Sequence, residues 1–272
     1  TLANNMDAHV GGGTQNTMVL RNIYEPPLQD TFEEGAFGFD NRLAQEVSSD
    51  ADGNYVIKLR EGVKFHGGED LTSDDLKYSI ERMLDPDVKS WRGSRIKHIG
   101  AVETPDPLTA KLVINNAPKP TIFPNLKYIF VLPRSWAEGQ SLAFFSTNTN
   151  GTGPYKLTRF VAESVAEMEM NPDWWGGADN IGFKKIVYRF VTEAGSRAAM
   201  LQRGDADVIA GVAPDFIQVL ESAGMTTVVA DSKAPAYVAL NNKDEENRFD
   251  PGTPNPMKDI RVRQALNYAI DR

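Results

Sequence analysis

The chain has 272 residues, of which 41% are apolar and 24% charged, and both shares are ordinary for a soluble globular protein. This length predicts two compact units. The absence of cysteine excludes disulfides, thiolate zinc sites and a cysteine nucleophile. A net charge of −8 without a basic cluster argues against a nucleic-acid partner, because a groove for phosphates needs Lys and Arg on one surface.

The sequence shows neither a membrane-spanning segment nor an export signal. No window approaches the roughly 20 apolar residues that a spanning helix needs. The N-terminal stretch TLANNMDAHV has neither the charged region nor the apolar core of a signal peptide. We therefore expect that any export signal has been removed.

Short strands and amphipathic helices are predicted in the first third of the chain. Residues 1–5 read as a short strand, and a helix over 14–24 ends at the following two prolines. An alternating strand over 54–59 comes next. Thr72 or Ser73 then caps a helix whose first turn carries two aspartates, and its apolar residues recur at helical spacing.

The rest of the chain alternates between predicted strands and helices. In chain order we expect a hairpin that turns at Pro105–Pro107, a strand at KYIFVL (127–132), two strands from GTGPYKL (151–157) onwards, a strand at 183–191, a helix from Ser196 closed by Gly204, a buried strand at ADVIAGV (206–212), a helix over 213–224 and a closing helix capped by Asp259. This order favours an α/β sheet with helices packed on it.

The sequence carries little that indicates catalysis. His9, His66 and His98 form no ligand-like pair, and there is no G-x-S-x-G motif. The neighbouring acids at 74–75 mark a helix start, and those at 205 and 207 flank a helix exit. We therefore predict no catalytic residues, no metal site and no cofactor.

A glycine-rich stretch, GGGT at 11–14, precedes the first long helix. The first amides of a helix lack internal partners, so this stretch could present backbone N–H groups to an anion. It lacks the lysine of a phosphate loop, and a plain flexible loop is the alternative interpretation.

Five motifs occur in register along the chain. They are NYVIKLREGVKFHGGEDLTSDDLKYSIERMLDP (54–86), GTGPYKL (151–157), NPDWWGG (171–177), RAAMLQRGDADV (197–208) and DIRVRQALNYAIDR (259–272). Together they resemble the extracellular solute-binding proteins of the peptide/nickel/opine type (family 5), the capture subunits of bacterial ABC importers.

The resemblance implies an α/β fold of the periplasmic-binding-protein type, in which two lobes close around a ligand. Residues 1–37 and 151–260 would form the first lobe, and 38–150 an additional subdomain. Residues 261–272 would begin the passage into a second lobe that is largely missing from this chain. We accordingly expect the apolar stripe of the closing helix to be partly exposed, at Val262, Leu266 and Ile270.

The resemblance also implies which residues meet a ligand. The loop MDAHVGGGTQN would line the cleft, and the candidates from this loop and from the additional subdomain are His9, Gly12, Gly13, Thr14, Gln15, Trp91, Tyr128 and Arg134. For Trp91 a role as a packing anchor is equally open. The loop has Asp7-Ala8 where Asp-Pro is usual in the family, and it lacks the acid that peptide-binding relatives can carry near Gly12, which weakens an expectation of amine recognition.

The implied function is solute capture for an ABC importer, with a peptide or similar small solute as ligand and a membrane permease as partner. We expect a monomer in the periplasm or outside the cell, associated with the membrane through the permease. Two alternatives belong to other classes: a carboxylate-dependent hydrolase on a related fold, and a signalling or chaperone binding protein. A hydrolase predicts a pair of acids in the cleft with a raised pKa. A chaperone predicts an exposed apolar patch.

Overall fold

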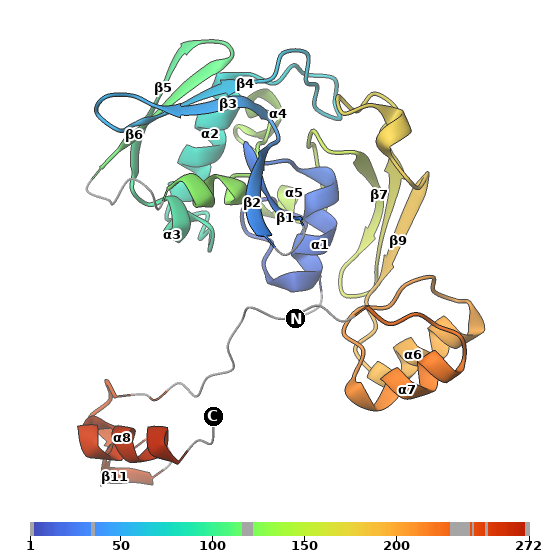
Figure 1. The fold of residues 1–272 in the computed structure, drawn as a ribbon. Helices are drawn as coiled ribbons and strands as arrows, with labels where there is room; N and C mark the ends of the chain where they lie inside the picture. The colour runs from blue at the N-terminus through green and yellow to red at the C-terminus, as the bar shows by residue number, and fades with distance from the viewer. Residues whose placement is uncertain are drawn as a thin grey trace. The chain divides into compact units, whose positions relative to one another are not determined.

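We describe a computed structural model of the protein (Figure 1), in which residues 3–33, 36–115, 122–228, 240, 242–247 and 250–269 are described. The chain divides into two compact units, Thr1–Val212 and Ala213–Arg272, which are treated separately below. The helices of the larger unit are α1 (Gly13–Ile23), α2 (Ser73–Leu84), α3 (Gly93–Ile96), α4 (Arg134–Ala137), α5 (Leu142–Phe145) and α6 (Ala194–Arg203), with 3-10 turns η2 (Phe123–Tyr128) and η3 (Ala178–Asn180).

The strands of the larger unit form three antiparallel sheets. They are β1 (Leu28–Glu33), β2 (Ala36–Asn41), β3 (Ala44–Ser49), β4 (Tyr55–Leu59), β5 (Ile99–Asp106), β6 (Thr109–Ile114), β7 (Tyr155–Val161), β8 (Val165–Met170) and β9 (Lys185–Arg189). Strands β1 and β2 form a hairpin, β3-β4-β6-β5 form a four-stranded sheet, and β7-β8-β9 form a three-stranded sheet. The predicted mixed α/β class is confirmed.

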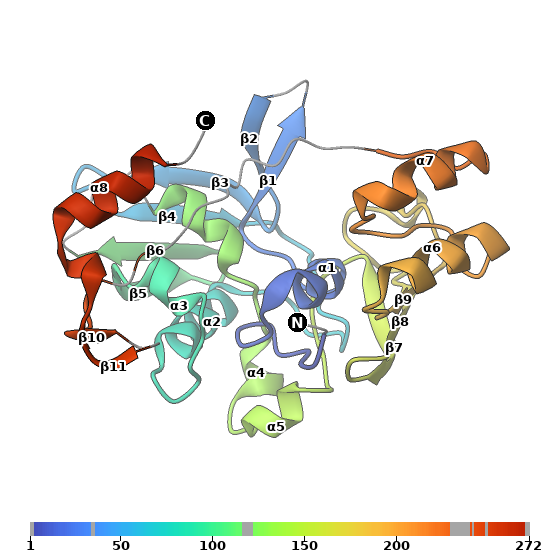
Figure 2. The ribbon, with the colours of Figure 1, turned by 90° about the horizontal axis from the view of Figure 1, so that it is seen from below.

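Helix α2 covers one face of the four-stranded sheet (Figure 2). Its N-cap is Thr72, as predicted, and the carboxylate of Asp75 accepts a hydrogen bond from the Thr72 backbone N–H at 2.8 Å. Leu76 and Ile80 are fully buried against strands whose inward side chains alternate as the sequence predicted. The hairpin of β5 and β6 turns at residues 107–108, slightly later than predicted.

A second core joins α1 to the three-stranded sheet. It gathers residues 3–24, 130–145 and 155–168, while the first core takes most of its members from 43–131. The second core thus takes residues 130–145 from the segment 38–150 that was expected to form the additional subdomain. The division into a lobe and an additional subdomain stays a prediction.

The GTGP motif allows the chain to pass close to the end of α1. A Cβ placed on Gly151 would lie 2.0 Å from the Ile23 carbonyl oxygen, and one on Gly153 would lie 2.4 Å from that of Asn22. Both glycines are therefore required by close backbone approach. Neither residue has a positive φ, so close approach and not an unusual backbone angle explains them. Tyr155 is 6% exposed, as expected for a residue packed beneath the motif.

The strand predicted at KYIFVL is wrong. The first part of this segment is the η2 turn, and residues 129–132 are non-regular, although all four are at most 2% exposed. Val131 N–H donates to the Glu25 carbonyl at 3.3 Å, and Leu132 N–H donates to the Ser79 hydroxyl at 2.9 Å. The apolar residues of the segment are buried, but its backbone bonds to single neighbours instead of to a strand.

Two further strand predictions fail. Ala3–Asn5 lie in non-regular structure, and residues 206–212 form bends. Val208, expected to be buried, is 84% exposed. A strand needs a neighbour for its backbone hydrogen bonds, and none of the described strands pairs with either segment. The helix before the second segment ends as predicted, at Gly204 with a φ of 74°.

The tryptophans of NPDWWGG anchor their turn to neighbouring side chains. Trp175 Nε1–H donates to the carboxylate of Glu25 at 2.7 Å, and Glu25 also pairs with Arg42 at 3.1 Å. The Arg42 guanidinium lies 5.3 Å from the Trp174 ring centre. These contacts fix the NPDWWGG turn to Glu25, in the segment between α1 and β1.

The smaller unit contains α7 (Pro214–Ser222), β10 (Glu246–Asn247), β11 (Asp250–Pro254), η4 (Pro256–Lys258) and α8 (Ile260–Tyr268). Asp259 caps α8 by accepting a hydrogen bond from Arg261 N–H at 2.8 Å. No described residue of α8 is buried: Val262 is half-buried and Leu266 is 40% exposed, which confirms the expected exposure. Ile270 lies outside the described residues.

Candidate functional site

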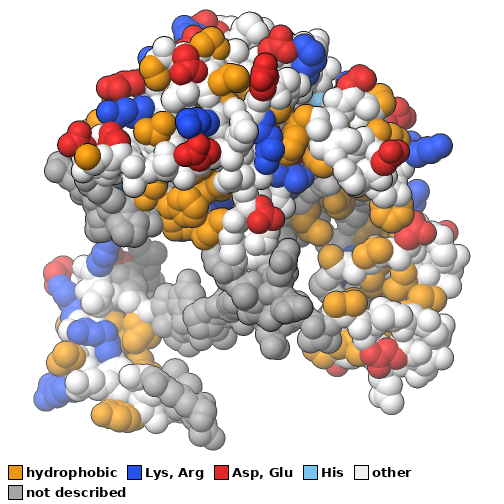
Figure 3. Space-filling model, turned by 45° about the horizontal axis from the view of Figure 1, so that its top comes forward, with side chains coloured by type: hydrophobic (Ala, Val, Ile, Leu, Met, Phe, Trp, Pro, Cys, Tyr) orange, Lys and Arg blue, Asp and Glu red, His pale blue; other side chains and the backbone are white. Residues whose placement is uncertain are grey.

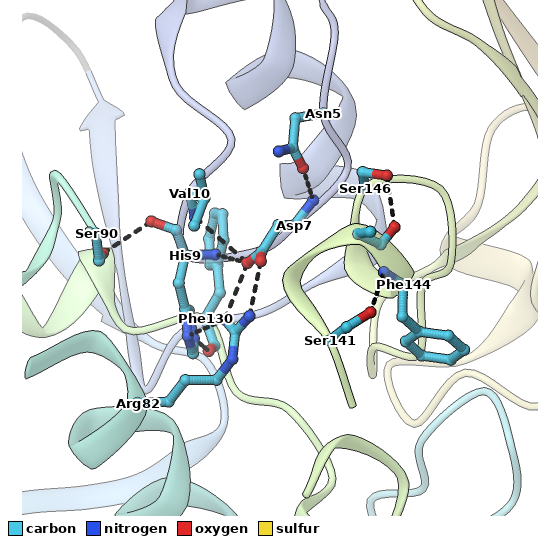
Figure 4. Close-up of polar contacts among 11 residues, drawn as sticks. Asn5, Asp7, His9, Val10, Arg82, Ser90, Phe130, Ser141, Phe144 and Ser146 are labelled. Carbon is cyan, nitrogen blue, oxygen red and sulfur yellow. Dashed lines mark hydrogen bonds and ion pairs between the residues drawn. The ribbon is translucent and has the colours of Figure 1, made fainter. Parts of the chain in front are cut away.

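The N-terminal loop is organised by the side chain of Asp7 (Figure 4). One carboxylate oxygen accepts the backbone N–H of His9 at 2.8 Å and that of Val10 at 3.3 Å. The Asp7 carbonyl accepts the N–H of Gly11 at 2.9 Å. An aspartate that bonds to the amides that follow it is a typical turn former, so the loop enters the glycine stretch in one defined direction.

Asp7 is also ion-paired with Arg82 of α2. Arg82 Nη1 lies 3.0 Å from one carboxylate oxygen and Nη2 lies 2.7 Å from the other, and both side chains are at most 5% exposed. Burial on its own would raise the pKa of Asp7, but the Arg82 guanidinium outweighs burial and holds that pKa below its usual range. The pair connects the N-terminal loop to the helix that covers the four-stranded sheet.

His9 completes this buried network. Its Nδ1 lies 3.0 Å from Arg82 Nη1, which can only donate, so Nδ1 accepts and Nε2 carries the proton. Nε2–H then donates to the Phe130 carbonyl at 2.8 Å. Burial, followed by the charge of Arg82, lowers the pKa of His9 to about 3, so the ring is neutral. The side chain is fully buried, and it supports the loop from behind.

The glycine stretch presents the start of α1. Gly12 is the N-cap, with no side chain to cap the helix, and Gly13 begins the helix with a φ of 81°. Thr14 is exposed and Gln15 is half-buried. The first turn carries no acidic residue. The first turn of α1 is therefore uncapped by any side chain, and an anion-facing role for its amides stays a prediction.

Trp91 lies directly against this stretch. Its indole Nε1–H donates to the Gly11 carbonyl at 3.4 Å, and a Cβ on Gly12 would lie 3.2 Å from the same nitrogen. The Tyr128 ring meets the Trp91 ring edge to face at 6.1 Å. Trp91 keeps 40% of its surface exposed. The structure thus brings together the loop glycines, Trp91 and Tyr128, which are distant in sequence.

Two arginines that the sequence analysis missed belong to the same cluster. The Arg92 guanidinium lies 4.6 Å from the ring centres of both Trp91 and Phe130 and is almost fully buried. Arg95 lies over the Tyr128 ring at 5.4 Å. The run WRGSR, which places two arginines directly after the candidate tryptophan, was the signal that could have identified them.

Arg134 lies apart from this cluster. Its backbone N–H donates to Asp75 at the start of α2, at 2.7 Å, and its side chain pairs with Glu138 at 3.1 Å. Trp91 follows the opposite end of α2, and the helix between Asp75 and Leu84 is about 14 Å long at 1.5 Å per residue. Arg134 therefore lies beside the first turn of α2, whereas Trp91 comes after its last turn.

Two pockets among the described residues lie nearby, and neither is lined by a predicted site residue. One, between Tyr24, Asp30 and Lys127, has a volume of about 20 Å³, which is enough for roughly one water. The other, of about 220 Å³, lies at the end of α2 beside Lys89 and Lys97. Of the predicted residues, the loop glycines, Trp91 and Tyr128 lie together, and Trp91 keeps an exposed face there.

The described residues contain no group of three or more His, Asp or Glu side chains suited to a metal ion. Among the same residues, no helix is long and apolar enough to cross a membrane. Two acids have a pKa raised by burial, Glu25 and Asp75. Glu25 bonds to Trp175 and Arg42, and Asp75 bonds to the start of α2, so both are held in structural contacts away from the exposed face of Trp91.

Comparison with known proteins decides the family. Residues 39–272 match the sequence model of the bacterial extracellular solute-binding proteins, family 5. The chain belongs to this family. The resemblance based on the five motifs is therefore confirmed.

Curated relatives of this family 5 chain include the glutathione-binding protein GsiB of Pectobacterium atrosepticum, which is 30% identical over 89% of the chain and 46% of that protein. A putative ABC transporter peptide-binding protein of Brucella ovis is 27% identical over 92% of the chain and 45% of that protein. The chain thus spans about half the length of the curated relatives it matches.

Solved structures show the same fold. MoaA from A. tumefaciens in complex with mannopinic acid has a TM-score of 0.78 and 24% identity, covering 99% of this chain and 53% of that one. NikZ from Campylobacter jejuni in complex with Ni(L-His) has a TM-score of 0.75 and 22% identity, covering 98% of this chain and 51% of that one. At sequence identities below 25%, this structural similarity shows the fold of the chain and nothing about its ligand.

Proposed function

We propose that this family 5 chain is part of the solute-binding component of an ABC importer, which captures a peptide or similar small solute and delivers it to a membrane permease. The observation that carries the proposal is the surface where the loop glycines meet Trp91 and Tyr128. An aromatic wall beside a few backbone donors is the usual composition of a small-solute site. The relatives named for glutathione and for peptides support the same class of ligand.

The contacting groups that we propose are the backbone of Gly12 and Gly13, together with Thr14, Gln15, Trp91 and Tyr128. His9 acts from behind, since its buried ring fixes the loop to Arg82 and Phe130. Arg134 is retained only as a contact for a ligand or partner that extends along α2.

The protein acts by binding rather than by catalysis in this proposal. Of the two acids with raised pKa values, Glu25 binds the NPDWWGG turn and Asp75 caps the start of α2. The hydrolase alternative would instead require two carboxylates facing the same open site. Basic and acidic side chains intermingle over the described residues on the face shown in Figure 3, whereas a nucleic-acid-binding surface would gather basic side chains on one face.

Calorimetric titration of the full-length protein with dipeptides, oligopeptides, glutathione, opines, sugars and nickel–histidine tests the proposal. At least one class should bind, and Trp91→Ala should weaken that binding. Phe183→Ala is the matched control, because Phe183 is an aromatic residue with 71% exposure that is not part of the Trp91 surface. Silence across all the ligand classes would overturn the proposal.

A further inference from the structure

Arg92 is a buried cation without a counter-ion. The residue is 1% exposed, and none of the described carboxylates forms an ion pair with it. Its Nη2 makes one long hydrogen bond of 3.4 Å to the Gly11 carbonyl, and its Nε is buried with no hydrogen-bond partner. A guanidinium removed from water normally requires a carboxylate partner, because desolvation of an unpaired charge costs several kcal/mol.

The nearest acid does not supply the missing charge. Asp7 gives both of its carboxylate oxygens to Arg82. Burial, followed by repulsion from Arg21, lowers the pKa of Arg92 to about 10, so the side chain stays protonated at neutral pH. Two aromatic faces, those of Trp91 and Phe130, contribute only the weaker attraction of a ring for a cation.

Other groups at this surface are also positive. Arg92 points at Gly11, two residues before α1 begins, and the first turn of α1 has neither a side-chain cap nor an acidic residue. The N-terminal end of a helix carries a partial positive charge. Arg95, exposed beside Tyr128, likewise has no carboxylate partner among the described residues. A buried guanidinium against Trp91, an exposed guanidinium against Tyr128 and the loop before a helix start thus meet at the Trp91–Tyr128 pair.

We infer that this surface takes an anionic group of the bound solute, specifically a carboxylate, which supplies the counter-charge that the described residues do not provide. The inference rests on the proposed function. The first-turn amides of α1 and the Arg95 side chain contact the carboxylate, while Arg92 acts on it through the Trp91 layer as a positioning residue. Trp91 and Tyr128 hold the adjoining part of the solute. A solute presented by its ammonium group is disfavoured here.

The first experiment compares each ligand with a neutral counterpart. Full-length protein is titrated by calorimetry with di- and tripeptides, glutathione and opines, each as the free acid and as the corresponding amide. The free acids should bind at least about tenfold more tightly, and high salt should reduce this ratio. Equal or tighter binding of the amides would overturn the inference and leave the solute-binding function intact. Absence of binding by both members of every pair would overturn both.

Variants then assign the effect to the arginines. Arg92→Met should lower the acid-to-amide ratio severalfold, and Arg92→Lys, which keeps the charge, should restore part of it. A purely structural role for Arg92 would weaken acid and amide together and leave their ratio unchanged, which would count against the inference. If Arg92→Met does not fold, Arg95→Gln tests the inference instead, and its acid-to-amide affinity ratio should also fall. Arg159→Gln, which changes an exposed arginine on β7, should leave this ratio unchanged.

Discussion

The guanidinium of Arg82 donates two hydrogen bonds, of 3.0 and 2.7 Å, to the carboxylate of Asp7, although the two residues are 75 positions apart. The pair is buried and joins the N-terminal loop to α2. Since the loop continues into the glycines beside Trp91, the same pair that stabilises the fold also positions the candidate surface.

Removal of one member of this pair should be strongly destabilising. Asp7→Ala leaves the Arg82 charge buried and unpaired, and we expect the free energy of unfolding to fall by about 3–5 kcal/mol, measured by urea denaturation. Glu138→Ala breaks the exposed pair with Arg134 and should cost less than about 1 kcal/mol. Similar losses for the two variants would contradict the structural role of the buried pair.

Two histidines with lowered pKa values, the buried His9 and the half-buried His66, should make stability depend on pH. The pKa of His9 is lowered to about 3 and that of His66 to about 4, in both cases chiefly by burial. Between pH 4 and 6.5, the ordinary pKa of histidine, these two side chains bind protons in the unfolded chain but stay neutral in the folded protein. Stability is therefore fully present above pH 6.5 and falls as the pH drops, by about 1.4 kcal/mol per pH unit for each histidine.

Unfolding free energies at several pH values between 4 and 7 measure this slope, and His66→Gln should reduce it. His66 Nε2–H donates to the Gly153 carbonyl at 2.9 Å, a bond that the glutamine amide can replace without titrating. Asp7 does not contribute in this window, because its lowered pKa places its loss of stability below the ordinary value of 3.8. An unchanged slope in the variant would show that His66 is protonated in the folded protein.

Close approach at the GTGP motif predicts a steric effect. Gly151→Ala places a methyl group 2.0 Å from the Ile23 carbonyl oxygen, so the end of α1 must move, and we expect a loss of about 1–3 kcal/mol. Gly182→Ala is the matched control, since its Cβ would meet nothing within 4 Å and its φ is not positive. Thermal unfolding of both variants tests the difference, and equal midpoints would contradict it.

The contact between Gly12 and Trp91 predicts a change in ligand affinity. Gly12→Val adds a branched side chain where even a Cβ lies 3.2 Å from the indole nitrogen, so the ring must shift. We expect the solute affinity to fall by roughly tenfold, or about 1.4 kcal/mol, with a change in Trp91 fluorescence. Stability should change little, because Gly12 is an extended N-cap on the open face of the loop. Unaltered affinity would remove Gly12 from the site.

Local features were predictable from the sequence. The helix from Ser73 was predicted together with its cap, since capping and helical spacing depend on residues within a few positions of one another. The Gly204 and Asp259 helix ends were predicted for the same reason. By contrast, KYIFVL was predicted to be a strand and is not one, because its apolar composition does not specify which neighbour receives its backbone hydrogen bonds.

The α/β class, the family and the residue types of the loop could be predicted from the sequence, because they depend on composition, short-range pattern and motif order. Three features needed the fold: His9 is buried behind the loop, Arg134 lies at the other end of α2, and Arg92 is a buried cation without a carboxylate partner among the described residues. Burial and ion pairing join residues tens of positions apart, and a linear pattern does not record which distant side chains meet.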